Sequence, residues 1–419
     1  MIDLKLPIIS ELLWVDSHQQ HTYAEMAHSI DFWITKLQQE GIKPGQRIAL
    51  FIPATPLFFS ILFAIWHLEA CGCPINLRLP PEGVERYLER LKPHFTIYPS
   101  HIKKHADAPT SELLSQPALF IMTSGTTGEP KIAVLTLDNL IANAAGALPF
   151  LDYRVNDRWL LTLPLYHVGG IGILIRSVLA RAAIVTDSRH PDVTHLSAVP
   201  SQLYRASPVY KRLRCLLVGG EPIRPLSPQL PVIASYGLTE MGSLVLAKKK
   251  PMNEYLGLPL PGREARLNLE GEIEVRGESL FQGYWNGHYV DKQEGWFGTK
   301  DLGRFCPNEG FAIIGRKDRQ FISGGENIQP EEIEKCLLGL EGVQEAAVIA
   351  VPHPEFGERP AAFIVGSIDY DQMKGALLEL LPRYKIPDTF ALLDELPKNG
   401  LKTNRTLLRQ IWDRKNLNR

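Results

Sequence analysis

The chain has 419 residues, of which 45% are hydrophobic and 22% are charged, proportions that are ordinary for a folded protein and exclude a disordered or fibrous chain. Its 45 basic and 46 acidic side chains leave a net charge of -1, so no long-range field would recruit nucleic acid or an anionic membrane. At this length, two or three domains are expected.

The cysteines and the apolar segments give expectations about the cellular compartment. An odd number of scattered cysteines differs from the dense, even pattern of secreted disulfide scaffolds, so reduced thiols are expected. No second Cys or His pair follows Cys71-Gly-Cys73 at zinc-like spacing, which disfavours a structural metal. Residues 1–9 do not resemble a signal peptide, and the apolar stretch 57–68 is shorter than the ~20 residues of a spanning helix. We therefore expect a cytoplasmic protein without stable membrane insertion. The cysteines are Cys71, Cys73, Cys215, Cys306 and Cys336.

The first part of the chain alternates strand-like and helix-like segments. Strands are expected at short apolar runs between polar turns, and helices where apolar residues recur with a helical period. This alternation predicts an α/β body with largely parallel sheets. The expected strands are 47–52, 118–122, 159–163, 183–186 and 215–218, and the expected helices are 24–39 and 56–69.

The pattern changes twice towards the C-terminus. After Gly257, frequent glycines separate short strands such as 272–275, which predicts a small β-rich subdomain. Further on, Pro330 opens a helical pattern, as proline often does in the first turn of a helix, and short strands follow. The predicted fold class is α/β, with a large N-terminal domain of layered sheets and helices over residues 1–317 and a small mobile α+β domain over residues 318–419.

The segment from Thr123 to Lys131 follows an expected strand and reads Thr-Ser-Gly-Thr-Thr-Gly-Glu-Pro-Lys. Glycines let the backbone approach a polyphosphate and point N–H groups at it, while the hydroxyls and the lysine ammonium complete the cradle. We therefore expect this loop to bind the phosphates of ATP. The expected phosphate-binding residues are Thr123, Ser124, Gly125, Thr126, Thr127, Gly128 and Lys131.

Two other interpretations of the loop can be compared with this one. The P-loop of kinases and GTPases places its lysine directly after the last glycine, whereas Lys131 comes three positions after Gly128, so that interpretation fails on spacing. A surface turn rich in glycine, serine and threonine stays open for the loop taken alone.

With three further motifs, the chain resembles the adenylate-forming superfamily of acyl-CoA synthetases, adenylation domains and luciferases. The motifs follow the loop in the family's order and are Tyr236-Gly-Leu-Thr-Glu240, Thr299-Lys-Asp301 and Gly315-Arg-Lys-Asp318. The resemblance covers nearly the whole chain. It implies an enzyme that uses ATP to join a carboxylic acid to a thiol by way of an acyl-adenylate.

The same resemblance implies a nucleotide site. Tyr236 would stack on adenine, and Asp301 would accept hydrogen bonds from the ribose. Glu240 and Thr127 would hold Mg²⁺, for which oxygen ligands are suited. Taken in isolation, Glu240 or Asp301 would more often be a solvated surface acid. The expected adenine and ribose residues are Gly219, Gly220, Glu221, Tyr236, Gly237, Asp301 and Arg316.

Two positions are implied for the small domain. Asp318 corresponds to the family's hinge, about which the small domain turns between adenylation and thiol transfer. A lysine near the C-terminus would bridge the reacting carboxylate and the α-phosphate. The family's usual Pro-Lys followed by Ser-Gly-Lys is altered here to Pro-Lys-Asn-Gly-Leu-Lys-Thr, so Lys402 is favoured for that role and Lys398 is the alternative. Lys402, Lys131 and His167 form the expected catalytic set.

Within the superfamily, the chain is most similar to the o-succinylbenzoate-CoA ligases of menaquinone biosynthesis, on residues 164–170 and 321–334. His167 would lie at the acid pocket, and a structural histidine is the competing interpretation. A substrate with two carboxylates needs a cation for the one that does not react, and Arg176 and Arg78 are the candidates. The expected acid-binding residues are His167, Arg176, Arg78 and Thr239.

The expected cofactors are ATP, Mg²⁺ and CoA as co-substrate, and the expected partner is a small carboxylic acid. No nucleic acid is expected, and assembly as a homodimer stays open. Alternative functions are another aryl- or fatty-acyl-CoA ligase, an adenylation enzyme that loads a carrier protein, or a non-catalytic ATP-binding protein.

Overall fold

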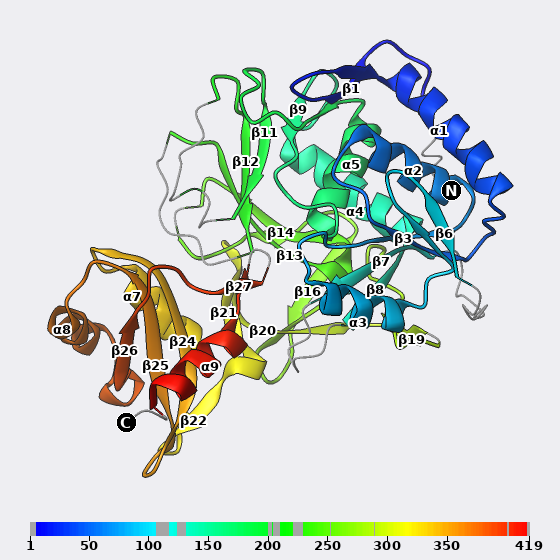
Figure 1. The fold of residues 1–419 in the computed structure, drawn as a ribbon. Coiled ribbons are helices and arrows are strands. Elements are labelled where there is room, and N and C mark those ends of the chain that lie inside the picture. The colour runs from blue at the N-terminus through cyan, green and yellow to red at the C-terminus, as the bar shows by residue number, and fades with distance from the viewer. Residues whose placement is uncertain are drawn as a thin grey trace.

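The computed structural model describes residues 6–105, 117–123, 131–199, 203, 210–220, 229–251, 253–288, 290–399 and 402–416. Figure 1 shows a large body of sheets and helices, with the C-terminal elements gathered at one side of it. Across the described residues, no helix has the length and apolarity that crossing a bilayer requires.

An eight-stranded sheet carries the two strands that flank the phosphate loop. Its central pairs β4/β3, β3/β5 and β4/β7 are parallel, while the pairs towards both edges are antiparallel. Its strands, in spatial order, are β19 (Val290–Lys292), β18 (Gly283–Trp285), β8 (Lys131–Thr136), β7 (Pro117–Thr123), β4 (Cys71–Pro74), β3 (Arg47–Leu50), β5 (Phe95–Ile97) and β6 (Ile102–Lys104).

A nine-stranded sheet forms the second layer of the body. Its central strands pair in parallel, whereas β2, β14 and β15 pair antiparallel at the two edges. The two sheets confirm the prediction of an α/β body with largely parallel strands. The strands, in spatial order, are β15 (Leu258–Pro259), β14 (Ser243–Lys249), β13 (Val232–Leu238), β12 (Cys215–Gly219), β11 (His195–Ala198), β9 (Arg158–Leu160), β10 (Ala183–Val185), β1 (Leu12–Val15) and β2 (Gln20–Thr22).

Helices connect these two layers. A buried cluster combines residues of α1, α2, α4 and α5 with residues from strands of both sheets. Local sequence sets where the helices begin: Thr22 and Glu25 form a capping box at α1, and Pro56 occupies the first turn of α2. The helices of the body are α1 (Tyr23–Gln39), α2 (Pro56–His67), α3 (Pro81–Leu91), α4 (Leu137–Leu151) and α5 (Val168–Ala180).

The β-rich stretch after Gly257 contributes strands to three sheets, with β15 pairing beside β14 in the nine-stranded sheet. Four of its strands form a separate antiparallel sheet, as the glycine pattern predicted. Strands β18 and β19 instead pair beside β8, next to the phosphate loop. The separate antiparallel sheet consists of β16 (Arg263–Leu267), β17 (Glu272–Gly277), β20 (Phe297–Cys306) and β21 (Gly310–Arg316).

The C-terminal module is an α+β unit with its own buried cluster, as predicted. Its main sheet pairs β24 with β25 antiparallel, and β26 joins β25 in parallel. A small hairpin, β27 with β28, precedes the last helix. Its elements are β22 (Phe321–Ser323), β23 (Glu326–Ile328), α7 (Pro330–Leu338), β24 (Val343–His353), β25 (Gly357–Gly366), α8 (Tyr370–Leu380), β26 (Thr389–Leu392), β27 (Lys398–Asn399), β28 (Lys402–Thr403) and α9 (Arg405–Asn416).

Polar contacts join this module to the body beside the short 3-10 helix η2 (Lys317–Arg319). The Gln329 side-chain amide donates to the Arg316 carbonyl at 3.1 Å. On α7, Lys335 forms an ion pair of 3.3 Å with Glu254 of the body. Both contacts are polar, the one at Gln329 buried and the one at Lys335 on the surface, as is common at a joint between two domains.

Candidate functional site

The phosphate loop is held at both ends by an antiparallel strand pair. Thr123 ends β7 and Lys131 begins β8, and the two residues are cross-strand partners. The Thr123 hydroxyl also donates to the Lys131 carbonyl at 3.4 Å. The other expected phosphate-binding residues lie outside the described residues, and they are Ser124, Gly125, Thr126, Thr127 and Gly128.

Lys131, Tyr284 and Glu240 form a cluster beside the loop. The Lys131 Nζ lies 4.7 Å from the centre of the Tyr284 ring, and the Tyr284 hydroxyl donates to Oε1 of Glu240 at 2.5 Å. Burial and then the negative charge of Glu240 raise the pKa of Tyr284, so the phenol keeps its proton at neutral pH. The cluster thus joins the expected phosphate lysine to the expected magnesium ligand.

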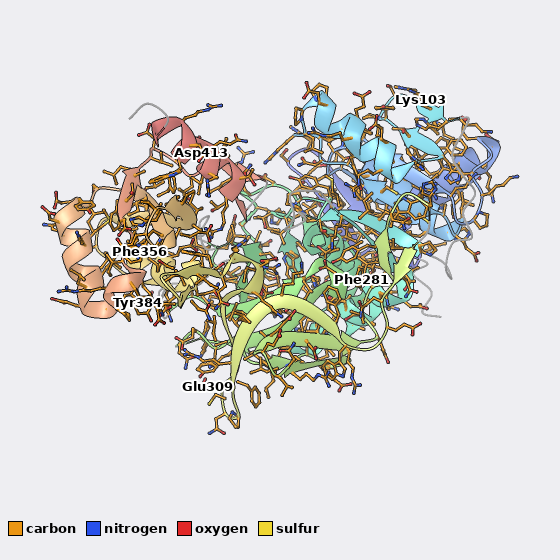
Figure 2. The ribbon with its side chains drawn as sticks, turned by 90° about the horizontal axis from the view of Figure 1, so that it is seen from below. Lys103, Phe281, Glu309, Phe356, Tyr384 and Asp413 are labelled. Carbon is orange, nitrogen blue, oxygen red and sulfur yellow. The ribbon has the colours of Figure 1, made fainter. Side chains whose placement is uncertain are left out.

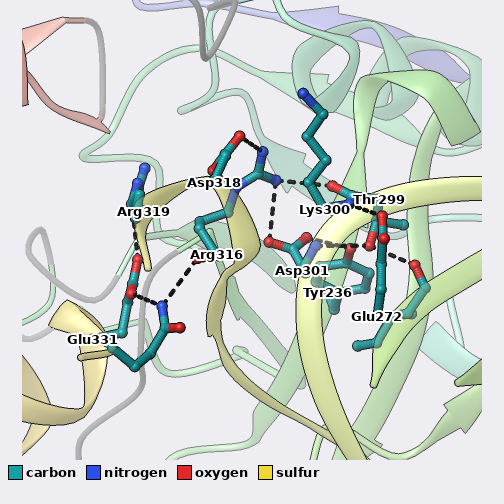
Figure 3. Close-up of polar contacts among 11 residues, drawn as sticks. Tyr236, Glu272, Thr299, Lys300, Asp301, Arg316, Asp318, Arg319 and Glu331 are labelled. Atoms are coloured by element: carbon teal, nitrogen blue, oxygen red, sulfur yellow. Dashed lines mark hydrogen bonds and ion pairs between the residues drawn. The ribbon is translucent and has the colours of Figure 1, made fainter. Parts of the chain in front are cut away.

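A second cluster contains three of the expected adenine and ribose residues, Tyr236, Asp301 and Arg316 (Figure 3). The Tyr236 hydroxyl donates to Oδ2 of Asp301 at 2.6 Å, and Nη1 of Arg316 is 3.2 Å from Oδ1. Arg316 also binds Asp318 through Nη2 at 2.9 Å. A carboxylate has about four acceptor positions, so Asp301 can still accept hydrogen bonds from a ribose. Burial, followed by the charge of Asp301, raises the pKa of Tyr236 well above its usual value, which keeps the phenol a donor.

The ends of adjacent strands bring the two clusters together. Gly219 at the end of β12 is paired with Ser235 of β13, and Tyr236 follows on the same strand. A side chain at Gly237 would place a Cβ 2.2 Å from the Ser243 carbonyl, so glycine is required there. Thr239 and Glu240 then lie in the short 3-10 helix η1 (Thr239–Met241). Ligand sites at the carboxyl ends of parallel strands are common in α/β folds.

Two further positions of the expected adenine pocket differ in what the structure shows. Gly220 is exposed and has φ of +84°, a conformation that favours glycine. Glu221 lies outside the described residues.

Lys300 lies between Thr299 and Asp301 in the motif Thr299-Lys-Asp301. Its φ is +62°, in the left-handed region, which costs a residue with a side chain roughly 1 kcal/mol. The main-chain N–H of Lys300 donates to Oε1 of Glu272 at 2.9 Å. This hydrogen bond to a carboxylate holds the turn that precedes Asp301.

Arg176 is the most unusual of the expected acid-binding residues. It lies in α5 with 1% of its surface exposed, and its guanidinium is 4.9 Å from the centre of the Trp159 ring. In the described part of the chain, Nε and Nη1 have no hydrogen-bond partner, and no acidic side chain forms an ion pair with it. Burial lowers the pKa of Arg176 to about 10.

A second buried arginine, Arg263, lies within electrostatic range of Arg176. Its Nη1 donates to the Pro261 carbonyl at 2.9 Å and its Nη2 to the Asn143 carbonyl. Burial and then the positive charge of Arg176 lower the pKa of Arg263 to about 10. Two buried positive charges therefore reinforce each other in this region, which favours binding of an anion.

The remaining acid-binding candidates occupy less constrained positions. His167 is the N-cap residue of α5, partly buried, with its ring centre 4.6 Å from that of Tyr166. Arg78 is exposed on the loop after β4. Thr239 begins η1 and is partly buried. The three residues lie on different elements, and their roles in binding the acid stay predictions.

The hinge and lysine candidates lie at the joint and in the hairpin of the small domain. Asp318 is in η2, between the body and β22, with its carboxylate on Arg316. Lys398 forms an ion pair of 2.9 Å with Glu345 of β24. The backbone of Lys402 lies in β28, while its side chain is outside the description.

Glu240 fits a magnesium ion that the protein and the phosphates of a nucleotide bind together. Among the described residues, no three His, Cys, Asp or Glu side chains gather to form a metal site of their own. Mg²⁺ commonly needs only one or two carboxylates when substrate phosphates supply other ligands, and Glu240 provides one such carboxylate.

Sequence reasoning missed two residues of this region. Tyr284 follows a glycine in a short strand, and only the pairing of β18 with β8 brings it to Lys131. Arg263 follows Pro261 and Gly262 at the start of a strand, a position at which an arginine is usually exposed. No local signal distinguished either residue, because both depend on contacts far along the chain.

Comparison with known proteins gives family matches over most of the chain. The "AMP-binding enzyme" model matches residues 8–115 and 103–285, and the "AMP-binding enzyme C-terminal domain" model matches residues 332–402. Among curated proteins, the chain is 32% identical over 423 residues to 2-succinylbenzoate--CoA ligase of Escherichia coli (strain K12), covering 94% of this chain and 93% of that protein.

Solved structures resemble the chain along its whole length. A variant of E. coli MenE with bound OSB-AMS superposes with a TM-score of 0.83 and 29% identity, covering 96% of both chains. The o-succinylbenzoate coenzyme A synthetase (MenE) from Bacillus subtilis, in complex with ATP and magnesium ion, has a TM-score of 0.83 and 26% identity, covering 96% of this chain and 97% of that one.

Proposed function

The chain belongs to the AMP-binding enzyme family, and from this premise we propose that it is an ATP-dependent acid–thiol ligase that converts o-succinylbenzoate to its CoA thioester. The observation that supports this most is a pair of contact clusters built from the nucleotide motifs. Lys131, Tyr284 and Glu240 form one cluster. Tyr236, which lies in β13 four residues before Glu240, is bonded to Asp301 in the other.

In the first step, an oxygen of the acid's carboxylate attacks the α-phosphorus of ATP, and pyrophosphate leaves. Because two anions must approach each other, charge neutralisation and positioning are the main catalytic tasks. Lys131 and the loop N–H groups would bind the phosphates, Lys402 would contact the reacting carboxylate, and Glu240 would hold Mg²⁺, which neutralises phosphate charge when bound. Tyr236 and Asp301 would orient the nucleoside.

In the second step, the CoA thiol attacks the acyl-adenylate carbonyl and AMP leaves with the electron pair of the broken bond. We propose that the small domain, residues 318–419, turns about Asp318 between the two steps, as the resemblance implies. The polar contacts of Gln329 and Lys335 described at this joint are compatible with such a motion.

Arg176 supports an acid with two carboxylates. A buried guanidinium without a counter-ion is costly, and a bound carboxylate would supply the missing charge and hydrogen-bond acceptors. His167 lies at the start of α5, the helix that carries Arg176, and would also contact the acid, with Thr239 and Arg78 as further candidates. An aromatic acid with a single carboxylate would leave Arg176 unpaired.

A substrate panel tests the proposal. Purified protein is assayed for acid-dependent exchange of labelled pyrophosphate into ATP and for CoA thioester, using o-succinylbenzoate, aromatic monocarboxylic acids and fatty acids. We expect o-succinylbenzoate to give the highest kcat/KM in both assays. If only a monocarboxylic acid is turned over, that acid replaces o-succinylbenzoate as the proposed substrate. If no acid supports pyrophosphate exchange, the proposed ligase activity is wrong.

The reaction uses ATP and CoA, so we place it in the cytoplasm. Assembly as a homodimer is a prediction that light scattering of the purified chain would check.

A further inference from the structure

Tyr284 is the residue in contact with both charged side chains expected at the phosphates. We propose that Tyr284 is a positioning residue that fixes Glu240 and Lys131 relative to each other, and so sets the geometry of Mg²⁺·ATP binding. The inference deepens the proposed function and rests on it, because it concerns the same nucleotide site.

The hydroxyl of Tyr284 determines how Glu240 can bind a cation. It donates to Oε1 at 2.5 Å, within the usual range for a hydroxyl–carboxylate hydrogen bond. That bond fixes the orientation of the carboxylate and occupies a lone pair of one oxygen. Groups that orient a metal ligand in this way commonly change metal affinity when they are removed, although they touch no metal themselves.

The ring of Tyr284 supports the lysine by a different interaction. Lys131 is exposed at the start of β8, and its Nζ lies 4.7 Å from the ring centre. An ammonium over an aromatic face is attracted by the ring's quadrupole. The face therefore favours one position of a long side chain that would otherwise sample many rotamers.

Tyr284 can serve both groups because its own position is fixed. Its strand β18 pairs with β8, the strand that Lys131 begins, with Tyr284 opposite Ala133. The buried Phe281, labelled in Figure 2, packs edge-on against the Tyr284 ring, with the ring centres 4.9 Å apart. The Phe281 N–H also donates to the Glu240 carbonyl at 2.8 Å. Both the main chain and the side chain of Glu240 are thus bonded to the segment that carries Tyr284.

The hydroxyl and the ring can be separated by two substitutions. Tyr284→Phe removes the hydrogen bond to Glu240 and keeps the aromatic face under Lys131. Tyr284→Leu removes both. Tyr370→Phe, at a partly exposed tyrosine of α8, is the matched control. Binding is measured by calorimetry without any acid, once with ATP in EDTA and once with ATP over a Mg²⁺ titration, so no turnover contributes.

For Tyr284→Phe, we expect unchanged affinity for ATP in EDTA and a Mg²⁺ midpoint about 10-fold higher than in the wild type. Saturating Mg²⁺ should restore its rate of pyrophosphate exchange. For Tyr284→Leu, we expect the same change in midpoint and, in addition, several-fold weaker binding of ATP in EDTA. Tyr370→Phe should match the wild type in each measurement.

Three results would overturn the proposal. One is a Mg²⁺ midpoint for Tyr284→Phe equal to that of the wild type. Another is a Tyr284→Phe defect that excess Mg²⁺ does not correct while the thermal unfolding curve is unchanged, which would indicate a role in the acid step. The third is that the wild-type protein binds no ATP, which would contradict the proposed function as well. Either of the first two results would contradict only the role of Tyr284 and leave the proposed function intact.

Discussion

Arg176 bears a charge that no acidic side chain among the described residues neutralises. Burying an ion without a partner costs several kcal/mol in effective terms, so the rest of the fold must offset this cost. A carboxylate bound next to the guanidinium would recover part of it. If Arg176 binds the second carboxylate as proposed, it does so at the expense of the stability of the free protein.

Substitution of Arg176 should separate the two effects. For Arg176→Met, we expect the KM for o-succinylbenzoate to rise by roughly 30-fold or more, because losing one member of a buried charge pair costs about 2 kcal/mol or more. The melting temperature should stay the same or increase. Steady-state kinetics and calorimetry measure both quantities.

Arg181→Met is the control for this substitution, since Arg181 is exposed at the C-cap of the same helix. It should change neither quantity. An Arg176→Met variant with unaltered KM would place the second carboxylate elsewhere.

At the scale of an element, the β27–β28 hairpin separates the two candidate lysines. Lys398 is the cross-strand partner of Thr403, and Lys402 is the partner of Asn399. The side chain of Lys398 is engaged in the ion pair with Glu345, so Lys402 is the lysine for which we predict the catalytic role.

We therefore expect Lys402→Ala to lower acid-dependent pyrophosphate exchange by about 10²- to 10³-fold, as loss of a group that stabilises developing charge commonly does. Thioester formation from synthetic acyl-adenylate should remain within a few-fold of the wild type. Lys398→Ala is the matched control and should keep both half-reactions. The reverse pattern, with Lys398→Ala inactive in exchange, would assign the role to Lys398.

At the scale of the whole molecule, buried histidines couple stability to pH. His195 of β11 is fully buried, bonded to the Leu151 carbonyl at 3.1 Å, and burial lowers its pKa to about 4. Burial also lowers the pKa of His94 to about 4. Above pH 6.5 these rings are neutral in both the folded and unfolded states, so they add no pH dependence. Below it, the unfolded chain binds protons that the folded chain takes up only near pH 4.

The free energy of unfolding should therefore fall as the pH is lowered from 6.5 towards 4, by at most about 1.4 kcal/mol per pH unit for each histidine. Urea titrations followed by tryptophan fluorescence measure this dependence, since Trp159 packs against His195 with ring centres 5.2 Å apart. In His195→Gln the dependence should be weaker than in the wild type. An identical dependence in the two proteins would contradict the assignment.

The joint between the domains gives a second prediction at this scale. Asp318 lies in the 3-10 helix η2, and proline has the φ of about −65° that such a turn uses. Asp318→Pro should therefore restrict the turn of the small domain, reducing one half-reaction by about 10²-fold while the other stays within a few-fold.

Pyrophosphate exchange and thioester formation from synthetic acyl-adenylate measure the two half-reactions separately. Asp318→Ala is the control, because it loses the same ion pair with Arg316 but keeps backbone freedom. Equal loss of both half-reactions in the proline variant would argue against a hinge at this position.

Much of the fold could be predicted from the sequence because it depends on local patterns. The apolar run of α2, the capping residues Thr22 and Glu25 of α1, and Pro330 at the start of α7 each act within one or two turns of chain. Pairing between distant strands is not local. The return of β18 to β8 depends on how the whole body packs, and no sequence period identifies it.

By itself, the sequence determined the chemistry of the nucleotide motifs, because glycines, hydroxyls, a lysine and carboxylates at fixed spacings define what a short segment can bind. Only the tertiary structure decided which of these groups are already engaged by others. Tyr284 contacts Lys131 and Glu240, and Arg176 is buried with no ion-pair partner among the described residues, through contacts between segments far apart in the chain. Burial and charge neutralisation are properties of that three-dimensional environment, and residue type and spacing do not specify them.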